Sequence, residues 1–101
     1  MSLAKKLVND IVTVVIPNGE IIGRLSSVDG DAVELISPRL LVPSREGDSF
    51  GFAPGVCITG ELSPARLEFR SYITITKTEE SVAQAWANFT SSLVVPNKKL
   101  F

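Results

Sequence analysis

The chain has 101 residues, of which 45% are hydrophobic and 21% are charged, so it fits one ordinary domain with one core. Ten Lys and Arg oppose eleven Asp and Glu, and the isoelectric point of about 5.3 lies far from that of a basic nucleic-acid-binding domain. The chain has no His and one Cys, which excludes histidine acid–base catalysis, His- or Cys₄-based zinc sites and an internal disulfide. We therefore expect a protein that is not an enzyme and that has no metal and no cofactor.

The N-terminal residues and the apolar stretches indicate where the protein resides. The first ten residues carry charge, but no long apolar segment follows them, so no secretory signal is expected. The longest apolar stretches, such as residues 11–16, are far shorter than the roughly 18 residues that a membrane helix needs. We expect a soluble, cytoplasmic protein with no membrane partner.

The N-terminal segment predicts a short helix. Leu3, Leu7 and Val8 recur at helical spacing, with two lysines on the opposite side. Residues 2–8 are therefore expected to form about two turns of amphipathic helix.

Turn-forming residues divide the next part of the chain into three expected strands. Asn18-Gly19 supplies the positive-φ residues of a tight hairpin, and Asp29-Gly30-Asp31 is a second turn signal. The segments around these turns are rich in β-branched and apolar residues, which is typical of strands. The expected strands are residues 11–16, about 20–28, and a third that begins at 32 and either ends near Ser37-Pro38 or continues through Val42. Together they predict an antiparallel meander.

An insertion precedes the last two expected strands. Residues 43–64 are rich in Pro and Gly, and part of this segment should be ordered because structureless loops of such length are unusual in compact domains. The apolar run 55–60 predicts an inserted strand or hairpin arm, in which Cys57 is expected to be buried. Alternating residues predict the last two strands at 67–69 and 73–76.

The pattern changes to a helical period after Thr78. An apolar stripe follows at helical spacing, and Thr78 is expected to cap the helix. The stripe comprises Val82, Ala85, Trp86, Phe89 and Leu93. Its aromatic residues are expected to pack on protein rather than on nucleic-acid bases. Because Pro96 biases the residue before it towards extended structure, the helix is expected to end near Ser91-Ser92 and to leave 94–101 as a tail.

Two segments resemble the motifs of the Sm-like (LSm) family. Asn18-Gly19 followed by residues 23–29 resembles the first motif, in which a hairpin glycine precedes the pattern Gly-x-apolar-x-x-apolar-Asp. Phe69-Arg70-Ser71 lies where the second motif reads apolar-Arg-Gly. The resemblance implies a mainly β fold, a five-stranded, strongly bent antiparallel SH3-like barrel. Residues 1–78 would form the core, with the short N-terminal helix and the insertion at 43–64, and 79–101 would pack on the same domain.

Gly23 lies within the second expected strand. A short sheet closes into a barrel only where its strands bend sharply, and a residue without Cβ permits both the bend and the close approach of a neighbouring backbone. The alternative is that Gly23 marks an isolated β-bulge.

The resemblance also implies a homo-oligomer. In Sm-like proteins the fourth strand of one subunit pairs with the fifth strand of the next, and the subunits close into a ring, here expected to contain about five to seven copies. The strand edges that would meet are those of the last two expected strands. The interface residues that follow from this are Leu67, Phe69, Ile73 and Ile75.

Single-stranded RNA is the partner that the resemblance implies, bound by loops at the centre of the ring. The matching residues are Asp29, Gly30, Asp31, Arg70, Ser71 and Tyr72. Arg70 and Tyr72 combine a guanidinium with an aromatic face, although Tyr72 could alternatively belong to the core. The other cations considered for RNA are Arg39, Arg45 and the pair Lys98-Lys99.

Departures from the family pattern leave a second function open. Family members place a base-reading Asn a few residues after the aspartate that matches Asp29, and this chain has none there. Asp31 adds negative charge where phosphate would approach, and Ser71 replaces the glycine of the second motif. The alternative is a structural or protein-interaction ring that has lost RNA recognition. Some compact phage Sm-like proteins depart in this way, and a phage protein would reside in the host cytoplasm.

Overall fold

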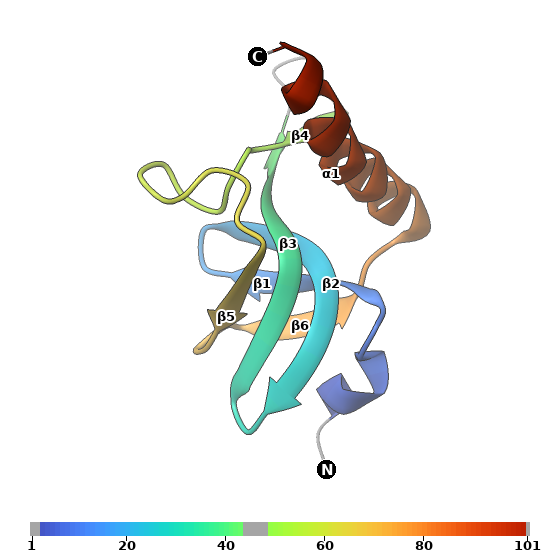
Figure 1. Ribbon diagram of the computed structural model, residues 1–101. Helices are drawn as coiled ribbons and strands as arrows, with labels where there is room; N and C mark the ends of the chain where they lie inside the picture. Colours follow the sequence, from blue (N-terminus) through green and yellow to red (C-terminus); the bar gives the residue numbers. More distant parts are fainter. Residues whose placement is uncertain (1–2, 44–48, 101) are drawn as a thin grey trace.

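A computed structural model describes residues 3–43 and 49–100, with side chains described for 4–43 and 49–91. The elements in chain order are the 3-10 helix η1 (Leu3–Leu7), the strands β1 (Ile11–Ile16), β2 (Gly19–Asp29), β3 (Ala32–Pro43), β4 (Phe50–Phe52), β5 (Arg66–Phe69) and β6 (Thr74–Lys77), and the helix α1 (Glu80–Leu100) (Figure 1). The molecule is therefore mainly β, with one C-terminal helix.

The first three strands form the expected meander. β1 pairs antiparallel with β2, and β2 pairs antiparallel with β3. Gly30 makes the second turn with a φ of 62°, in the left-handed region that glycine adopts without strain. Of the two alternatives for the third strand, the longer one is correct, because β3 continues through Ser37-Pro38 to Pro43. Ser37 has a φ of 51° and interrupts the extended backbone of β3.

The outer strands bend the sheet. Residues 33–36 of β3 pair with β5, and residues 41–43 pair with β4. β6 pairs antiparallel with residues 12–15 of β1, so the sheet order is β4-β3-β2-β1-β6 with β5 beside β3. Figure 1 shows β1 and β6 crossing behind β2 and β3, so the antiparallel sheet is strongly bent.

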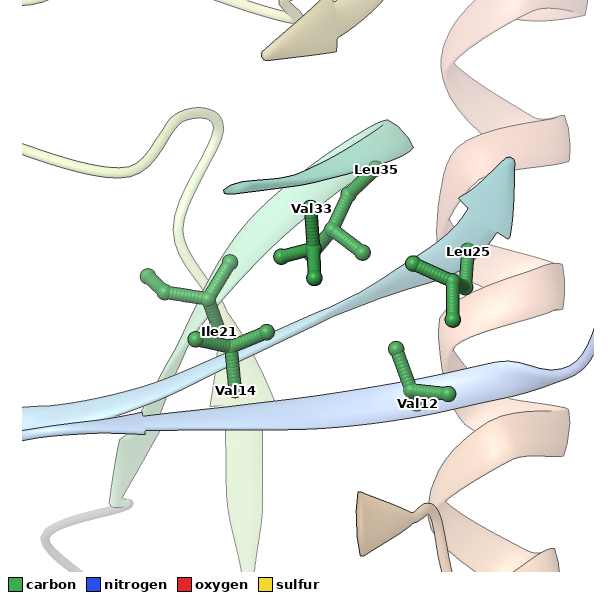
Figure 2. Close-up of a cluster of buried hydrophobic side chains, with 6 residues drawn as sticks. All are labelled: Val12, Val14, Ile21, Leu25, Val33 and Leu35. Atoms are coloured by element: carbon green, nitrogen blue, oxygen red, sulfur yellow. The ribbon is translucent and has the colours of Figure 1, made fainter. Parts of the chain in front are cut away.

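The hydrophobic core lies between the bent strands. Six buried side chains form one cluster, here called the core cluster, and they come from alternate positions of β1, β2 and β3 (Figure 2). Its members are Val12, Val14, Ile21, Leu25, Val33 and Leu35. Because side chains alternate between the two faces of a strand, each of the three strands directs one face to this cluster.

Gly23 lies in the core-facing row of β2. The register between β2 and β3 shifts at this residue, as at a β-bulge. A Cβ on Gly23 would lie 3.1 Å from Cβ of Leu35 and 3.2 Å from the backbone oxygen of Ile36. At Gly23, therefore, a register irregularity like that of a β-bulge coincides with a close approach of β3.

The aromatic stripe of α1 packs on protein, as expected. Trp86 is only 5% exposed, and its Nε1–H donates to the backbone oxygen of Ser37 at 2.9 Å. The ring of Phe89 lies against that of Phe52, with centroids 5.6 Å apart. These contacts hold α1 beside β3 and β4 (Figure 1).

The residue that caps α1 is Glu79, so the expectation for Thr78 is wrong. Ser81 donates its hydroxyl to Oε1 of Glu79 at 2.6 Å and its backbone N–H to Oε2 at 3.4 Å. The hydroxyl of Thr78 is buried and shares a 2.9 Å hydrogen bond with the hydroxyl of Thr13 in β1. Thr78 therefore ties the start of the helix to the sheet instead of capping it.

The helix also ends later than expected. α1 continues through Pro96 to Leu100, so the expected end near Ser91-Ser92 and the tail at 94–100 are wrong, and residue 101 lies outside the described residues. A proline removes one internal hydrogen bond, and its effect on the preceding residue is a bias rather than a prohibition. The hydrogen bonds that propagate the helix on either side outweigh this bias.

Two shorter segments also differ from expectation. Residues 3–7 form a 3-10 helix rather than two α-helical turns, since so short a segment gains too few hydrogen bonds to stabilise an α-helix. The ordered strand of the insertion is β4, and residues 55–60 form no strand. Within this loop, Ser63 N–H donates to the oxygen of Pro54 at 2.7 Å, so local turns take the place of a strand ladder. Cys57 is exposed on the loop, and the expectation that it is buried is wrong.

Candidate functional site

Two loops that are far apart in the sequence meet at one end of the sheet. The turn between β2 and β3 and the connection between β5 and β6 line a hollow of about 530 Å³, here called the loop hollow. The residues that line it are Gly30, Asp31, Arg70, Ser71 and Tyr72. These are five of the six residues that the sequence analysis assigned to RNA binding.

β3 places both loops at the same end of the molecule. On one edge of β3, the pair Asp29↔Ala32 closes the hairpin with β2. On the other edge, the pair Val33↔Phe69 is the last before Arg70. Because these pairs involve consecutive residues of β3, the two loops emerge beside one another.

Backbone conformation links Ser71 to the glycine of the second motif. Ser71 has a φ of 57°, in the left-handed region that favours glycine. Ser71 therefore has a backbone conformation that glycine would adopt with less strain.

Tyr72 contacts both the core and the loop hollow. Its half-buried side chain packs against the core cluster and also borders the loop hollow. Packing restricts the ring to few orientations, so the aromatic surface in the hollow is held by the core.

Charge in and around the loop hollow is mixed. Nη2 of Arg70 lies 2.8 Å from Oε2 of Glu68, and the two side chains are 67% and 51% exposed. The carboxylate of Asp31 makes no hydrogen bond or ion pair with the residues that the structure describes. Arg70 is thus held by a neighbour, whereas Asp31 is available to a ligand.

Asp29, unlike the other five candidate residues, does not line the loop hollow. It lines a neighbouring hollow of about 150 Å³ together with Glu34 and Glu68. Glu34 accepts hydrogen bonds from Ser26 at 2.7 Å and Arg66 at 3.3 Å. This neighbouring surface carries three carboxylates, which repel phosphate.

Arg39 is poorly placed for RNA binding. Arg39 is 3% exposed, its Nη1 donates to the oxygens of Pro38 at 2.8 Å and Pro64 at 3.2 Å, and burial lowers its pKa. It anchors the loop that follows β4. Arg45 lies outside the described residues, and Lys98-Lys99 belong to the end of α1 opposite the β2–β3 turn (Figure 1).

The outer edges of β5 and β6 are unpaired within residues 3–43 and 49–100. β5 pairs only with β3, and β6 pairs only with β1. Leu67 is half-buried, Phe69 and Ile75 pack against the core cluster, and Ile73 is 64% exposed. The backbone edges and Ile73 are thus exposed to a partner, whereas the side chains of Phe69 and Ile75 are largely used within the chain.

A further hollow was not foreseen from the sequence. It has a volume of about 430 Å³ and lies where the segment between η1 and β1 meets β1, β2, β6 and the start of α1. Its charged residues are Asp10, Arg24, Lys77 and Glu80, and Nη1 of Arg24 donates to the oxygen of Asn9 at 2.7 Å. The equal numbers of cations and carboxylates favour no class of ligand.

Neither a metal site nor a membrane-spanning helix is found in the described parts of the chain. No group of three or more His, Cys, Asp and Glu side chains is placed there to hold a metal ion. None of the helices has the length and hydrophobicity needed to cross a bilayer. No protein-family model, curated protein or solved structure matches the chain.

Proposed function

We propose that the chain is a non-catalytic Sm-like module that forms a ring and binds single-stranded RNA in the loop hollow. The observation that carries this proposal is that the turn directly after the first motif-like segment lines the same hollow as Arg70 and Ser71 of the second. A guanidinium and an aromatic face are the groups with which proteins hold and stack unpaired nucleotides. The strand pairing supports the SH3-like barrel, since β5 and β6 extend opposite edges of one bent meander.

The ion pair of Arg70 is compatible with RNA binding. Both of its side chains are more than half exposed, and such surface pairs contribute about 0–1 kcal/mol to stability. Arg70 can therefore exchange Glu68 for a phosphate at little cost. Its guanidinium would then hold the backbone of the RNA while Tyr72 stacks on a base.

The free edge of β6 supports the assembly part of the proposal. Thr78 N–H donates to the oxygen of Ile11 at 3.0 Å. Hydrogen bonds recur at every second residue of an antiparallel pair, so Thr76 also faces β1 and the N–H of Ile75 points to the free edge. A β5 strand of a neighbouring subunit would pair with that edge.

Mass measurements on two variants test the ring. Ile75→Pro removes the outward N–H, and Ile75→Ala removes the packed side chain but keeps the N–H. We expect light scattering to give the mass of a ring for the wild type and for Ile75→Ala, and a lower mass for Ile75→Pro with its circular dichroism spectrum retained. A wild-type protein that is monomeric at micromolar concentration would contradict the ring.

Fluorescence anisotropy with short U-rich and A-rich RNAs tests RNA binding. We expect Arg70→Ala to weaken binding to both RNAs. We also expect the slope of the logarithm of affinity against the logarithm of salt concentration to become shallower by about one, since one phosphate contact is lost. Arg66→Ala is the matched control, since Arg66 is a neighbouring cation that does not line the loop hollow. Absence of binding to either RNA at low salt would overturn this function.

A second candidate function is a structural or protein-interaction ring without RNA. The carboxylates favour this second function, because they would repel the phosphates of RNA. Asp31 lies in the loop hollow, Asp29 lies beside the hollow, and Glu68 forms an ion pair with Arg70. A protein with the mass of a ring that binds neither RNA would identify this function.

A further inference from the structure

Among the described residues, Asp31 is the one carboxylate that lines the loop hollow. It follows Gly30 at the exposed turn between β2 and β3, and its side chain has no partner among the residues that the structure describes. An ionised carboxylate only accepts hydrogen bonds, whereas the amide that reads bases in Sm-like proteins both donates and accepts. The hollow therefore offers a base an acceptor with two oxygens.

The hydrogen-bonding edges of the four RNA bases respond differently to such an acceptor. Guanine presents two adjacent donors, N1–H and the 2-amino group, which match the two oxygens of a carboxylate. Uracil presents one N–H between two carbonyl oxygens, and adenine and cytosine each present an amino group beside a ring nitrogen that accepts. In these three bases an acceptor would face the carboxylate, and a polar contact without a donor is unfavourable.

We propose that the loop hollow selects guanine, with the carboxylate of Asp31 accepting hydrogen bonds from N1–H and the 2-amino group. This inference rests on the proposed RNA-binding function and specifies its ligand. Tyr72 provides the stacking face, and Arg70 holds a phosphate of the same strand.

The charge of Asp31 contributes to this selectivity. It repels the phosphates of every RNA alike, so it lowers the affinity for all sequences. Only guanine compensates for that repulsion with two hydrogen bonds. Selectivity therefore arises from a penalty on the other bases as well as from a favourable contact with guanine.

Anisotropy titrations with three A-rich heptamers that differ only in the central nucleotide test the inference. The central nucleotide is guanosine, inosine or uridine. Inosine keeps N1–H and the carbonyl oxygen of guanosine but lacks the 2-amino group. We expect the guanosine RNA to bind about tenfold more tightly than the inosine RNA, as for a two-point base contact.

The variant Asp31→Asn removes the negative charge and replaces one acceptor oxygen with a donor group. We expect this variant to lose the preference for guanosine over inosine and to bind the inosine and uridine RNAs more tightly than the wild type does. Glu20→Gln removes one negative charge from an exposed side chain outside the hollow, and we expect it to keep the preference. Circular dichroism checks that both variants fold.

The outcomes distinguish the two levels of the proposal. Binding of all three heptamers with equal affinity by the wild type would overturn guanine selection and leave RNA binding intact. A preference that persists in Asp31→Asn would show that another group reads the base, and would overturn the role of Asp31. Binding of none of the heptamers would overturn the proposed function and guanine selection together.

Discussion

The two halves of β3 are held in place by different parts of the chain. Residues 32–36 pair with β2 and β5 and supply Val33 and Leu35 to the core cluster. Residues 39–43 pair with β2 and β4 and lie beside α1 (Figure 1). Ser37 separates the halves with its φ of 51°, and its carbonyl accepts the hydrogen bond from Trp86.

The comparison shows that the candidate site depends on the first half. Residues 32–36 position both loops of the hollow, and two of them, Val33 and Leu35, belong to the core cluster. The second half is stabilised by contacts from outside the meander, such as the ring of Phe89 on Phe52 and the hydrogen bond from Arg39 to the oxygen of Pro64. We therefore expect damage to the second half to affect stability more than RNA binding.

Trp86→Ala should have the largest effect on stability. It removes a buried aromatic side chain, and we expect the free energy of unfolding to fall by about 3–5 kcal/mol. Urea denaturation followed by circular dichroism measures this change. Trp86→Phe keeps a ring but leaves the oxygen of Ser37 without its donor, at an expected cost of about 1–3 kcal/mol. If folded Trp86→Ala protein no longer bound RNA, the two halves would not be separable.

Gly23→Val should have a smaller effect on stability, through its contact with the first half of β3. A Cβ at this position already approaches Leu35 and Ile36 closely, and the valine branches add to the crowding, so we expect a loss of about 1–3 kcal/mol. The measurement is again urea denaturation, together with the oligomer mass. Gly51→Ala in β4 is the control, since the added methyl group would have no heavy atom within 4 Å other than those of Gly51 and the residues next to it in the chain. Unchanged stability and mass in Gly23→Val would contradict the importance of the close approach.

Ser71→Gly should stabilise the chain slightly. Glycine relieves the cost of a left-handed backbone but adds freedom to the unfolded chain, and the balance is a gain of about 0.5 kcal/mol. Ser63→Gly is a matched test outside the loop hollow, since the φ of Ser63 is 50°. Similar shifts in melting temperature are expected for both variants. A loss of stability in Ser71→Gly alone would indicate that the Ser71 side chain makes a stabilising contact.

The smallest expected effect concerns the start of α1. Hydrogen bonds from the hydroxyl and the backbone N–H of Ser81 lower the pKa of Glu79 below its ordinary value of 4.5. A carboxyl with a lowered pKa in the folded state stabilises the fold above its unfolded pKa, and this contribution is lost as the pH falls through the folded pKa. We expect Glu79→Gln to show a weaker fall in melting temperature between about pH 5 and about pH 3 than the wild type. Identical profiles would contradict the capping role.

Local patterns predicted the first half of β3 and its partners well. Turn residues and alternating apolar residues placed β1, β2 and the start of β3 within one or two residues, because pairing between successive strands depends on nearby residues. The residues of the loop hollow followed from the resemblance to Sm-like motifs. Their meeting depends on the register between β3 and β5, which no local pattern specifies.

Two of the errors involve contacts between residues that are far apart in the sequence. Thr78 does not cap α1 because Thr13 engages its hydroxyl. The strand of the insertion forms at Phe50–Phe52, next to Phe89, rather than in the apolar run that contains Cys57. Propensity and periodicity carry no information about such partners, so these features could not be read from the sequence.

The pairing of β6 with β1 has a consequence for how the chain folds. Residues 12–15 gain their second neighbouring strand only from residues 74–77, near the end of the sheet-forming part of the chain. Contacts between such distant segments form slowly, because a long loop must close before they are made. During synthesis, the outer edge of β1 therefore lacks this partner until Lys77 has left the ribosome. An exposed edge of β-branched residues is prone to aggregate, so we expect the yield of folded protein to depend on how quickly this last strand docks.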